Sequence, residues 1–329
     1  MRTGNTLKTF ASVVFLMAWL STPQAAEKVR VGVLKFGTVN WELDTIKHHG
    51  LDAAEGLEVV VMPFAGEDAT NVALQAGAVD IIVSDWLWVS RQRSAGQKLV
   101  FAPFSSAVGA IMVPADSPIK SLADLAGRKL GVAGGPFDKN WLLIRGLAKR
   151  NHGIDLETAA EPVYGSPALL AEKAMQGELD AVLTFWQFCA RLEGKGFRRL
   201  VSGSEAAEAL SGAGPVSALG YVFREDWAET NAKTAMGFMR TSRAAKEILK
   251  ISDAEWKRLN ALIKAEDENT LKVLMARFRE GIPDRAPADE EKDAERLYLV
   301  LAELGGERLV GRGKTLAPGT YWEALKTGP

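Results

Sequence analysis

A buried strand in the first third of the chain ends in groups that could bind a ligand. Residues 81–83 are apolar without alternation, which predicts a parallel strand covered on both faces. Ser84 or Asp85 can cap the helix that follows. Ligands of open α/β sheets bind outside the carboxyl ends of strands, beside helix N-termini. Trp86 and Trp88 could therefore stack on a ligand, although either could instead anchor the helix in the core.

The same pattern recurs later in the chain. Gly77-Ala-Val-Asp80 precedes the first strand, and Gly177-Glu-Leu-Asp180 precedes a second strand that ends at Thr184-Phe-Trp186. In both copies a glycine lies three residues before the aspartate, and a tryptophan six residues after it. This repeat predicts two lobes of similar topology, with Trp86 and Trp186 facing one another across a closing cleft.

Groups typical of catalysis or metal binding are sparse. The three histidines are His48, His49 and His152, and we interpret the first two as surface or packing residues of a helix. No set of His, Cys and carboxylate residues has metal-ligand spacing, and no Gly-x-Ser-x-Gly elbow occurs. Gly134-Gly135 before a helix could hold a phosphate, but two glycines are a weak signal. These residues favour a protein without a catalytic or metal site.

Composition and the N-terminus indicate an exported protein. The 329 residues are 47% hydrophobic and carry a formal net charge of −1, which argues against non-specific nucleic-acid binding. Arg2 and Lys8 precede the apolar segment 10–20, and a small polar segment follows, which predicts a signal peptide over residues 1–26. The apolar segment is too short to span a bilayer comfortably, although a retained anchor is the alternative. We expect a soluble monomer in the periplasm.

The remaining pattern predicts strands alternating with helices, followed by a helical tail. We expect tail helices over 231–250, 253–279 and 288–304, packed around the first lobe. The glycine- and serine-rich segment 202–215 is typical of a loop that returns between lobes.

Several phrases together resemble the periplasmic solute-binding proteins of ABC importers, in the branch for sulfonates, nitrate, taurine and thiamine precursors. The phrases that carry the resemblance are Leu74-Gln-Ala-Gly-Ala-Val-Asp80, Asp116-Ser-Pro-Ile-Lys-Ser-Leu-Ala-Asp-Leu-Ala-Gly-Arg-Lys-Leu-Gly131, Ala174-Met-Gln-Gly-Glu-Leu-Asp-Ala-Val182 and Arg224-Glu-Asp-Trp227. The resemblance implies an α/β, two-lobed periplasmic-binding-protein fold of type II, with two hinge crossovers near Ala110 and Val216. Lobe 1 would comprise 27–109 and 217–329, and lobe 2 would comprise 110–216. The partners would be an inner-membrane permease and ATPase.

The resemblance also implies that the strand-end loops of both lobes bind the ligand. Five of the eight tryptophans after residue 26 lie in or beside these loops. The ligand-binding residues expected on this basis are Lys35, Phe36, Thr38, Asn40, Trp41, Ser84, Asp85, Trp86, Trp88, Lys139, Trp141, Tyr164 and Trp186. Trp227, Trp256 and Trp322 in the tail are interpreted as packing residues.

Tryptophans from two lobes suggest a flat ligand sandwiched on closure, since indoles stack well on other π-systems. Lys139 opposes the dipole of its helix, which makes most sense beside an anion. Asp85 and Asp138 are contrary signs, unless they cap helices. We therefore expect a planar anionic aromatic ligand resembling pyrroloquinoline quinone, as cargo rather than as a cofactor. Covalent attachment to Lys35 or Lys139 is conjecture.

Other ligands and functions stay open. An aromatic cage for a quaternary ammonium is one alternative, and an aliphatic sulfonate, taurine or nitrate is another. The protein could also be a thiamine-precursor-related enzyme, or a carrier or sensor that acts without a permease. We expect no enzymatic activity, no resident cofactor and no metal.

Overall fold

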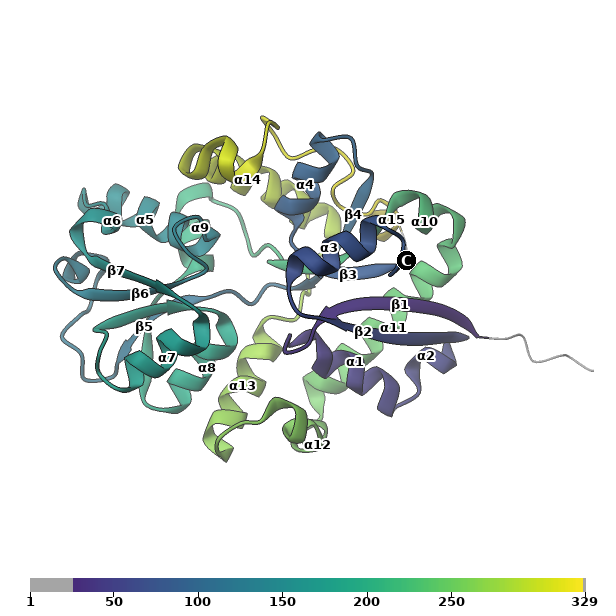
Figure 1. Cartoon of the computed structure of the whole chain (residues 1–329), viewed down its shortest axis with the longest axis horizontal. Coiled ribbons are helices and arrows are strands. Elements are labelled where there is room, and N and C mark those ends of the chain that lie inside the picture. The colour runs from purple at the N-terminus through teal and green to yellow at the C-terminus, as the bar shows by residue number, and fades with distance from the viewer. Residues whose placement is uncertain (1–25, 328–329) are drawn as a thin grey trace, which may run out of the picture.

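The computed structural model describes residues 26–327 and consists of two lobes side by side, each built on one five-stranded sheet (Figure 1). The predicted signal peptide lies, apart from Ala26, outside these residues. Within the described part of the chain, no helix has the length and apolar character needed to cross a membrane.

Lobe 1 contains a mixed sheet with one strand that arrives from late in the chain. In sheet order its strands are β2 (Leu57–Phe64), β1 (Glu27–Leu34), β3 (Ile81–Ser84), β10 (Leu219–Arg224) and β4 (Leu99–Ser105). Strand β1 pairs in parallel with β2 and β3, whereas β10 runs antiparallel to β3 and β4.

Lobe 2 repeats this arrangement. Its strands are β7 (Glu161–Gly165), β6 (Lys129–Ala133), β8 (Ala181–Thr184), β5 (Ala110–Pro114) and β9 (Phe197–Ser202). Strand β6 is parallel to β7 and β8, and β5 is antiparallel to β8 and β9. The predicted α/β fold with two lobes of similar topology is confirmed.

The repeated Gly-x-x-Asp motif holds equivalent strands together in the two lobes. The Asp80 carboxylate accepts hydrogen bonds from the backbone N–H of Arg30 at 2.8 Å and from its guanidinium. The Asp180 carboxylate likewise accepts the backbone N–H of Lys129 at 2.8 Å. The two aspartates therefore fix equivalent registers, between β1 and β3 in lobe 1 and between β6 and β8 in lobe 2, which explains why the motif occurs twice.

Helices cover both sheets and form the tail. Those of the first segment are α1 (Val39–His48), α2 (Leu51–Ala54), α3 (Glu67–Gln75) and α4 (Trp86–Ser94). Lobe 2 contains the 3-10 helix η1 (Leu122–Leu125) and helices α5 (Lys139–His152), α6 (Leu156–Ala159), α7 (Pro167–Met175), α8 (Trp186–Gly194) and α9 (Gly203–Ser211). The tail contains α10 (Glu225–Thr230), α11 (Ala232–Ile251), α12 (Asp253–Ile263), α13 (Glu268–Glu280), α14 (Pro287–Val310) and α15 (Ala324–Thr327).

The tail differs from the expectation in two respects. The single helix predicted over 253–279 is two helices, because Lys264 adopts a left-handed conformation (φ 55°) and Asp267 caps α13 through the N–H of Thr270. The tail also contacts both lobes rather than lobe 1 alone: α13 packs on α8, and α14 packs on α5 and α4 (Figure 1).

Two crossovers connect the sheets, over residues 106–109 and 212–218, and both are closely packed. A Cβ at Gly109 would lie 2.2 Å from the carbonyl oxygen of Thr184, so the chain can pass β8 only with a glycine there. On the second crossover, the buried Glu290 accepts hydrogen bonds from the N–H and hydroxyl of Ser217, each at 3.0 Å. The crossovers are thus anchored to β8 and to α14.

Candidate functional site

The two lobes meet at the carboxyl ends of their parallel strands and enclose a pocket of about 640 Å³, which we call the interlobe pocket. Its walls are the loop 35–41 that leads into α1, the facing sides of α7 and α8, and the tail segment 262–266. A site of this kind is expected in open α/β folds, because the loops after parallel strands converge there.

Cations outnumber acids in the lining of the interlobe pocket. Lys35, Arg191, Lys195 and Lys264 line it, against Glu172 and Glu266. The Arg191 guanidinium binds the Glu266 carboxylate at 2.7 Å and the carbonyl oxygen of Ile263 at 2.8 Å, which joins α8 to the tail. The pocket therefore suits a ligand with an anionic group.

Two helices begin at this pocket without a side-chain cap. The starts of α1 and α8 have Thr38 and Phe185 at their N-cap positions, and neither side chain accepts a hydrogen bond there. The helix dipole makes such an end favourable for an anion, although the N–H groups of Asn40 and Trp41 in α1 already donate to the carbonyl oxygens of Gly37 and Thr38. Close by, at the end of β8, the buried hydroxyl of Thr184 has no hydrogen-bond partner among the described residues. These groups could receive the oxygens of a small anion.

An aromatic cluster joins the lobes beside the pocket. It consists of Trp41, Trp186, Trp256 and Phe278. The Trp41 and Trp186 rings meet edge to face, with centroids 5.8 Å apart and planes at 83°. Edge-to-face aromatic pairs contribute about 0.5–1.5 kcal/mol beyond the burial of their area. This contact brings α1 of lobe 1 against α8 of lobe 2.

A second contact between the lobes is charged. We call Glu67, Asp85 and Asp138, which surround Lys139, the acidic cluster. The Lys139 ammonium lies 3.0 Å from the Asp85 carboxylate, an ion pair that joins the start of α5 to the start of α4. Glu67 and Asp85 come from lobe 1, whereas Asp138 and Lys139 come from lobe 2.

The acidic cluster shifts the pKa values of its members. Burial raises the pKa of Glu67, and the nearby charge of Asp85 raises it further. Burial also raises the pKa of Asp138, although the N–H of Trp141 opposes this. Burial alone would lower the pKa of Lys139, but Asp85, with help from Asp138 and Glu67, raises it. Three carboxyl groups around one ammonium group give this contact between the lobes an excess of acidic groups.

Comparison with known proteins identifies the family. Residues 46–253, more than half of the chain, match the model of the family described as NMT1/THI5 like. The chain belongs to the NMT1/THI5-like family. No curated protein sequence matches it significantly.

Solved structures with a similar fold include three sulfonate-binding proteins. The periplasmic aliphatic sulphonate binding protein SsuA from Escherichia coli is 22% identical over 90% of this chain and 92% of its own, with a TM-score of 0.68. The alkanesulfonate-binding protein SsuA from Xanthomonas axonopodis pv. citri, bound to MOPS, is 18% identical over 91% and 99% of the two chains, with a TM-score of 0.65. A putative periplasmic sulfonate-binding protein from Methylobacillus flagellatus KT is 14% identical over 87% and 89%, with a TM-score of 0.63. These similarities show that this NMT1/THI5-like chain has the periplasmic-binding-protein fold, and they confirm the predicted resemblance.

The structure places five of the predicted residues of this NMT1/THI5-like chain at the interlobe pocket: Lys35, Phe36, Thr38, Asn40 and Trp41. Phe36 is 94% exposed at the rim. The amide of Asn40 donates to the carbonyl oxygens of Leu34 and Gly37 at 2.9 and 2.8 Å, so it shapes the loop. Only its carbonyl oxygen is left for a ligand.

The predicted opposition of Trp86 and Trp186 is wrong. Among the described residues, the ring contacts of Trp186 are with Trp41 and Phe278. Trp86 is buried in another core cluster, beside the second crossover. Trp88 packs partly buried against the same cluster, because it already lies inside α4. The two indoles of this helix start therefore anchor it, and half-buried Ser84 ends the strand before them.

Trp141 is buried within lobe 2, and Tyr164, which is 40% exposed, shares a hydrogen-bond partner with it. The Trp141 ring is completely buried, and its N–H donates to the Glu157 carboxylate at 3.1 Å. The Tyr164 hydroxyl donates to the same carboxylate at 2.7 Å, and burial with this neighbour raises the pKa of Tyr164 to about 12. Both residues belong to a structural network of lobe 2, which argues against a direct ligand role.

The anion that the sequence suggested beside Lys139 is Asp85 itself. Asp85 accepts the N–H of Trp88 at 2.8 Å, so it caps α4 as well as pairing with Lys139. Asp138 caps α5 through the N–H of Trp141 at 3.1 Å. Capping by both aspartates is confirmed, and the inference that Lys139 requires an anionic ligand loses its basis.

The prediction that Trp256 is a packing residue is confirmed, since its ring is completely buried. Sequence reasoning did not place it or Phe278 beside Trp41, because both come from the tail and no local signal marks them as neighbours. Thr184 is the last residue of a strand end that the sequence already marked as part of a ligand loop. Glu67 follows shortly after the end of β2, and the same rule could have identified it.

Proposed function

We propose that this protein is the periplasmic substrate-binding component of an ABC importer, and that it captures a small aliphatic aminosulfonate such as taurine between its lobes. The observation that carries this proposal is the division of charge in the cleft. Uncapped helix starts and an excess of cations lie at the interlobe pocket, and the acidic cluster lies at a second contact between the lobes, outside the lining of that pocket. A ligand with a sulfonate at one end and an ammonium group at the other suits both sides.

The relatives support the sulfonate end of this ligand. The similar structures from Escherichia coli and Xanthomonas axonopodis pv. citri are named as sulphonate- and alkanesulfonate-binding proteins. These likenesses lie under 25% identity, and the charges of the two interlobe contacts support the choice of ligand.

A planar anionic aromatic ligand gets no such support. The sandwich that the tryptophans suggested would need parallel faces with space between them, but Trp41 and Trp186 contact one another edge to face. A tricarboxylate would also meet the carboxylates of the acidic cluster, which costs several kcal/mol when like charges are brought together away from water.

Domain limits and partners follow from the same proposal. Lobe 1 is proposed to comprise 27–109 and 217–329, and lobe 2 to comprise 110–216, with the strands of the two sheets divided accordingly. The expected partners are an inner-membrane permease and ATPase. We propose binding without catalysis, because His48, His49 and His152 lie outside the lining of the interlobe pocket.

Tryptophan fluorescence provides the test, since Trp41 lines the pocket and contacts Trp186. The chain from Glu27 onward is titrated with taurine, ethanesulfonate, nitrate and pyrroloquinoline quinone. We expect taurine to bind most tightly and the quinone not to bind specifically. Tight binding of the quinone with no response to either sulfonate would overturn the proposal.

The ammonium end of the ligand is tested with E67Q. This substitution removes one charge of the acidic cluster and should weaken taurine about tenfold while leaving ethanesulfonate unchanged. The matched control is D68N, which makes the same charge change on the next residue of α3. Equal losses for both ligands in E67Q would show that Glu67 does not contact the amine.

A further inference from the structure

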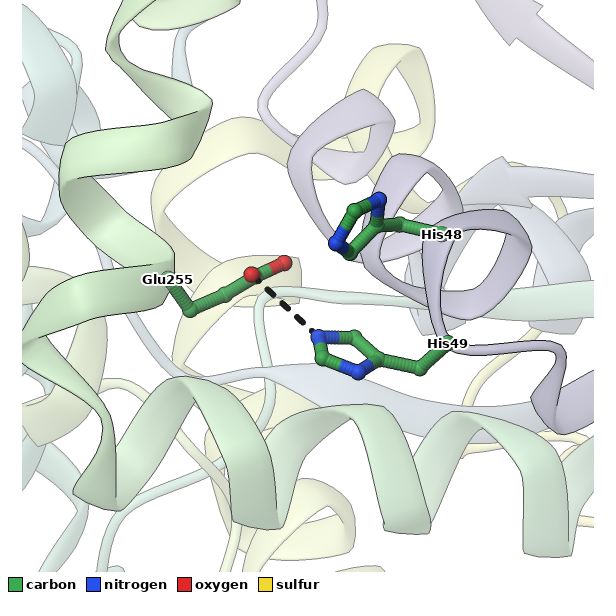
Figure 2. A group of neighbouring side chains, drawn as sticks. All are labelled: His48, His49 and Glu255. Atoms are coloured by element: carbon green, nitrogen blue, oxygen red, sulfur yellow. Dashed lines mark hydrogen bonds and ion pairs between the residues drawn. The ribbon is translucent and has the colours of Figure 1, made fainter.

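A group of metal-ligating side chains lies on lobe 1, away from the interlobe pocket. His48 is the last residue of α1 and His49 follows it, and Glu255 lies on α12. One ligand atom from each of the three residues lies within 4.8 Å of the others. Figure 2 shows both imidazole rings projecting from the end of α1 toward the Glu255 carboxylate. Glu255 lies 206 residues after His49, so the sequence shows no ligand spacing that joins the three.

We propose that His48, His49 and Glu255 form a binding site for one zinc ion. Zinc prefers imidazole nitrogen and carboxylate oxygen at about 2.0–2.2 Å in tetrahedral geometry. Two ligand atoms on such an ion lie roughly 3.4 Å apart. The His49 Nε2 and a Glu255 oxygen are already 3.2 Å apart, so a zinc ion could replace the proton between them with little movement.

The carboxylate of Glu255 is positioned before any metal binds. Its Oε1 accepts the Thr45 hydroxyl at 2.8 Å and an Arg258 N–H at 2.7 Å. Its Oε2 accepts the Arg258 Nε–H at 2.9 Å and faces His49. Arg258 thus contacts both carboxylate oxygens and holds the group in one orientation. Hydrogen bonds of this kind to a ligating carboxylate orient it for the metal.

Local charge and mobility also fit a cation. Arg258 shares its charge between Glu255 and Asp44, at 2.7 and 2.5 Å, so two carboxylates face one guanidinium. His48 is exposed, and the His49 side chain is 36% exposed, so both rings can rotate to complete the site. Three protein ligands leave one position for water. Magnesium and calcium prefer oxygen ligands, so the two imidazoles select against them.

The site is separate from ligand capture. Helix α1 begins at the interlobe pocket and carries His48 at its other end, about 15 Å away at the usual rise per residue. A bound zinc ion would join the end of α1 to α12. The proposal is therefore independent of the proposed function.

The experiment is a competition of the chelator-treated chain, from Glu27 onward, with a chromophoric zinc chelator of micromolar affinity. We expect one zinc ion per chain, no binding of magnesium or calcium, and at least a tenfold loss of zinc affinity in H48A and in H49A. The matched control is H152A, which removes the third histidine of the chain and should bind zinc normally. Both histidines of the site are partly or fully exposed, so the variants should fold, and circular dichroism checks this.

Thermal unfolding gives a second measurement. Zinc should raise the Tm of the wild type and of H152A, but not that of the double variant H48A/H49A. Zinc binding of unchanged affinity in the folded double variant would overturn the proposal, as would the absence of competition by the wild type.

Discussion

The start of α4 and the start of α8 occupy equivalent places in the two lobes but have different chemistry. Each follows a strand that its Gly-x-x-Asp motif holds in register. Asp85 caps α4 and pairs with Lys139, whereas Phe185 at the same position leaves α8 uncapped. The repeat thus keeps the residues that hold the strands and changes the residue that faces the cleft.

This difference indicates how one supersecondary unit can serve two ends of a ligand. A capped start with a carboxylate attracts a cation, and an uncapped start attracts an anion. One residue at the end of a strand decides which of the two a lobe presents.

The largest effect is expected from F185D, which gives α8 the aspartate cap that α4 has and so removes the difference between the two helix starts. The new carboxylate would occupy the free N–H groups and repel a sulfonate, so we expect at least a 100-fold loss of taurine affinity in a fluorescence titration. Stability should rise by about 1 kcal/mol, because the helix gains a cap. F185S is the control: it offers a weaker cap without charge and should retain more binding. Unchanged affinity in F185D would place the anion elsewhere.

The aspartates that hold the strand registers, Asp80 and Asp180, also differ between the lobes in how much they should contribute to stability. D80A should lower the free energy of unfolding by about 2 kcal/mol, because the 8% exposed Asp80 binds Arg30 through its backbone and guanidinium. D180A should cost about 1 kcal/mol or less, because Asp180 is 41% exposed and its Arg128 partner is 4.0 Å away. Urea unfolding measures both variants. Equal losses would show that the motif contributes the same amount in each lobe.

The substitution D85S keeps a cap on α4 but removes its charge. We expect taurine to bind about tenfold more weakly, since the ammonium group loses a partner, with stability changed by less than about 1 kcal/mol. Ethanesulfonate should bind as well or slightly better, because Lys139 is released from its ion pair. Isothermal titration of both ligands separates the effects. A parallel loss for both ligands would mean that Asp85 acts only by holding the lobes together.

The smallest effect expected is that of pH. The raised pKa values of Glu67 and Asp138 mean that these groups take up protons at higher pH than ordinary carboxyl groups do. Lowering the pH from 7.5 to 5 should therefore reduce taurine affinity by about threefold, as the acidic cluster loses negative charge. Ethanesulfonate affinity, which does not depend on an amine partner, should stay nearly constant. Identical pH profiles for the two ligands would separate the amine from this cluster.

The fold could be predicted from the sequence because its signals are local and repeated. Gly77 and Gly177 with their aspartates mark equivalent strands, and apolar runs mark the parallel pairs. The break at Lys264 was missed, since a lysine in a left-handed conformation has no sequence signal.

The candidate site could be predicted only in part. Periodicity shows that Trp41, Trp141 and Trp186 lie at loop ends, but the direction of a side chain depends on rotamer and neighbours. The Trp141 side chain is therefore buried inside lobe 2, and the Trp186 ring contacts Trp41 and not Trp86. The Lys139–Asp85 pair and the zinc ligands join distant segments, which a single sequence without homologues does not connect.

The attachment of α13 to lobe 2 has a consequence for kinetics. Arg277 pairs with Glu193 and Lys195 with Asp267, and the Asn269 amide donates to the carbonyl oxygen of Gly194 at 2.8 Å. Phe278 of the same helix packs on Trp41 and Trp256 of the lobe 1 side. If the lobes separate, α13 must lose either its ion pairs with lobe 2 or the ring contacts of Phe278 with Trp41 and Trp256. Added salt weakens exposed ion pairs and leaves aromatic packing largely intact. The Lys139–Asp85 pair also joins the lobes, so the residence time of a captured molecule would depend on ionic strength in either case, and more steeply if α13 departs from lobe 2.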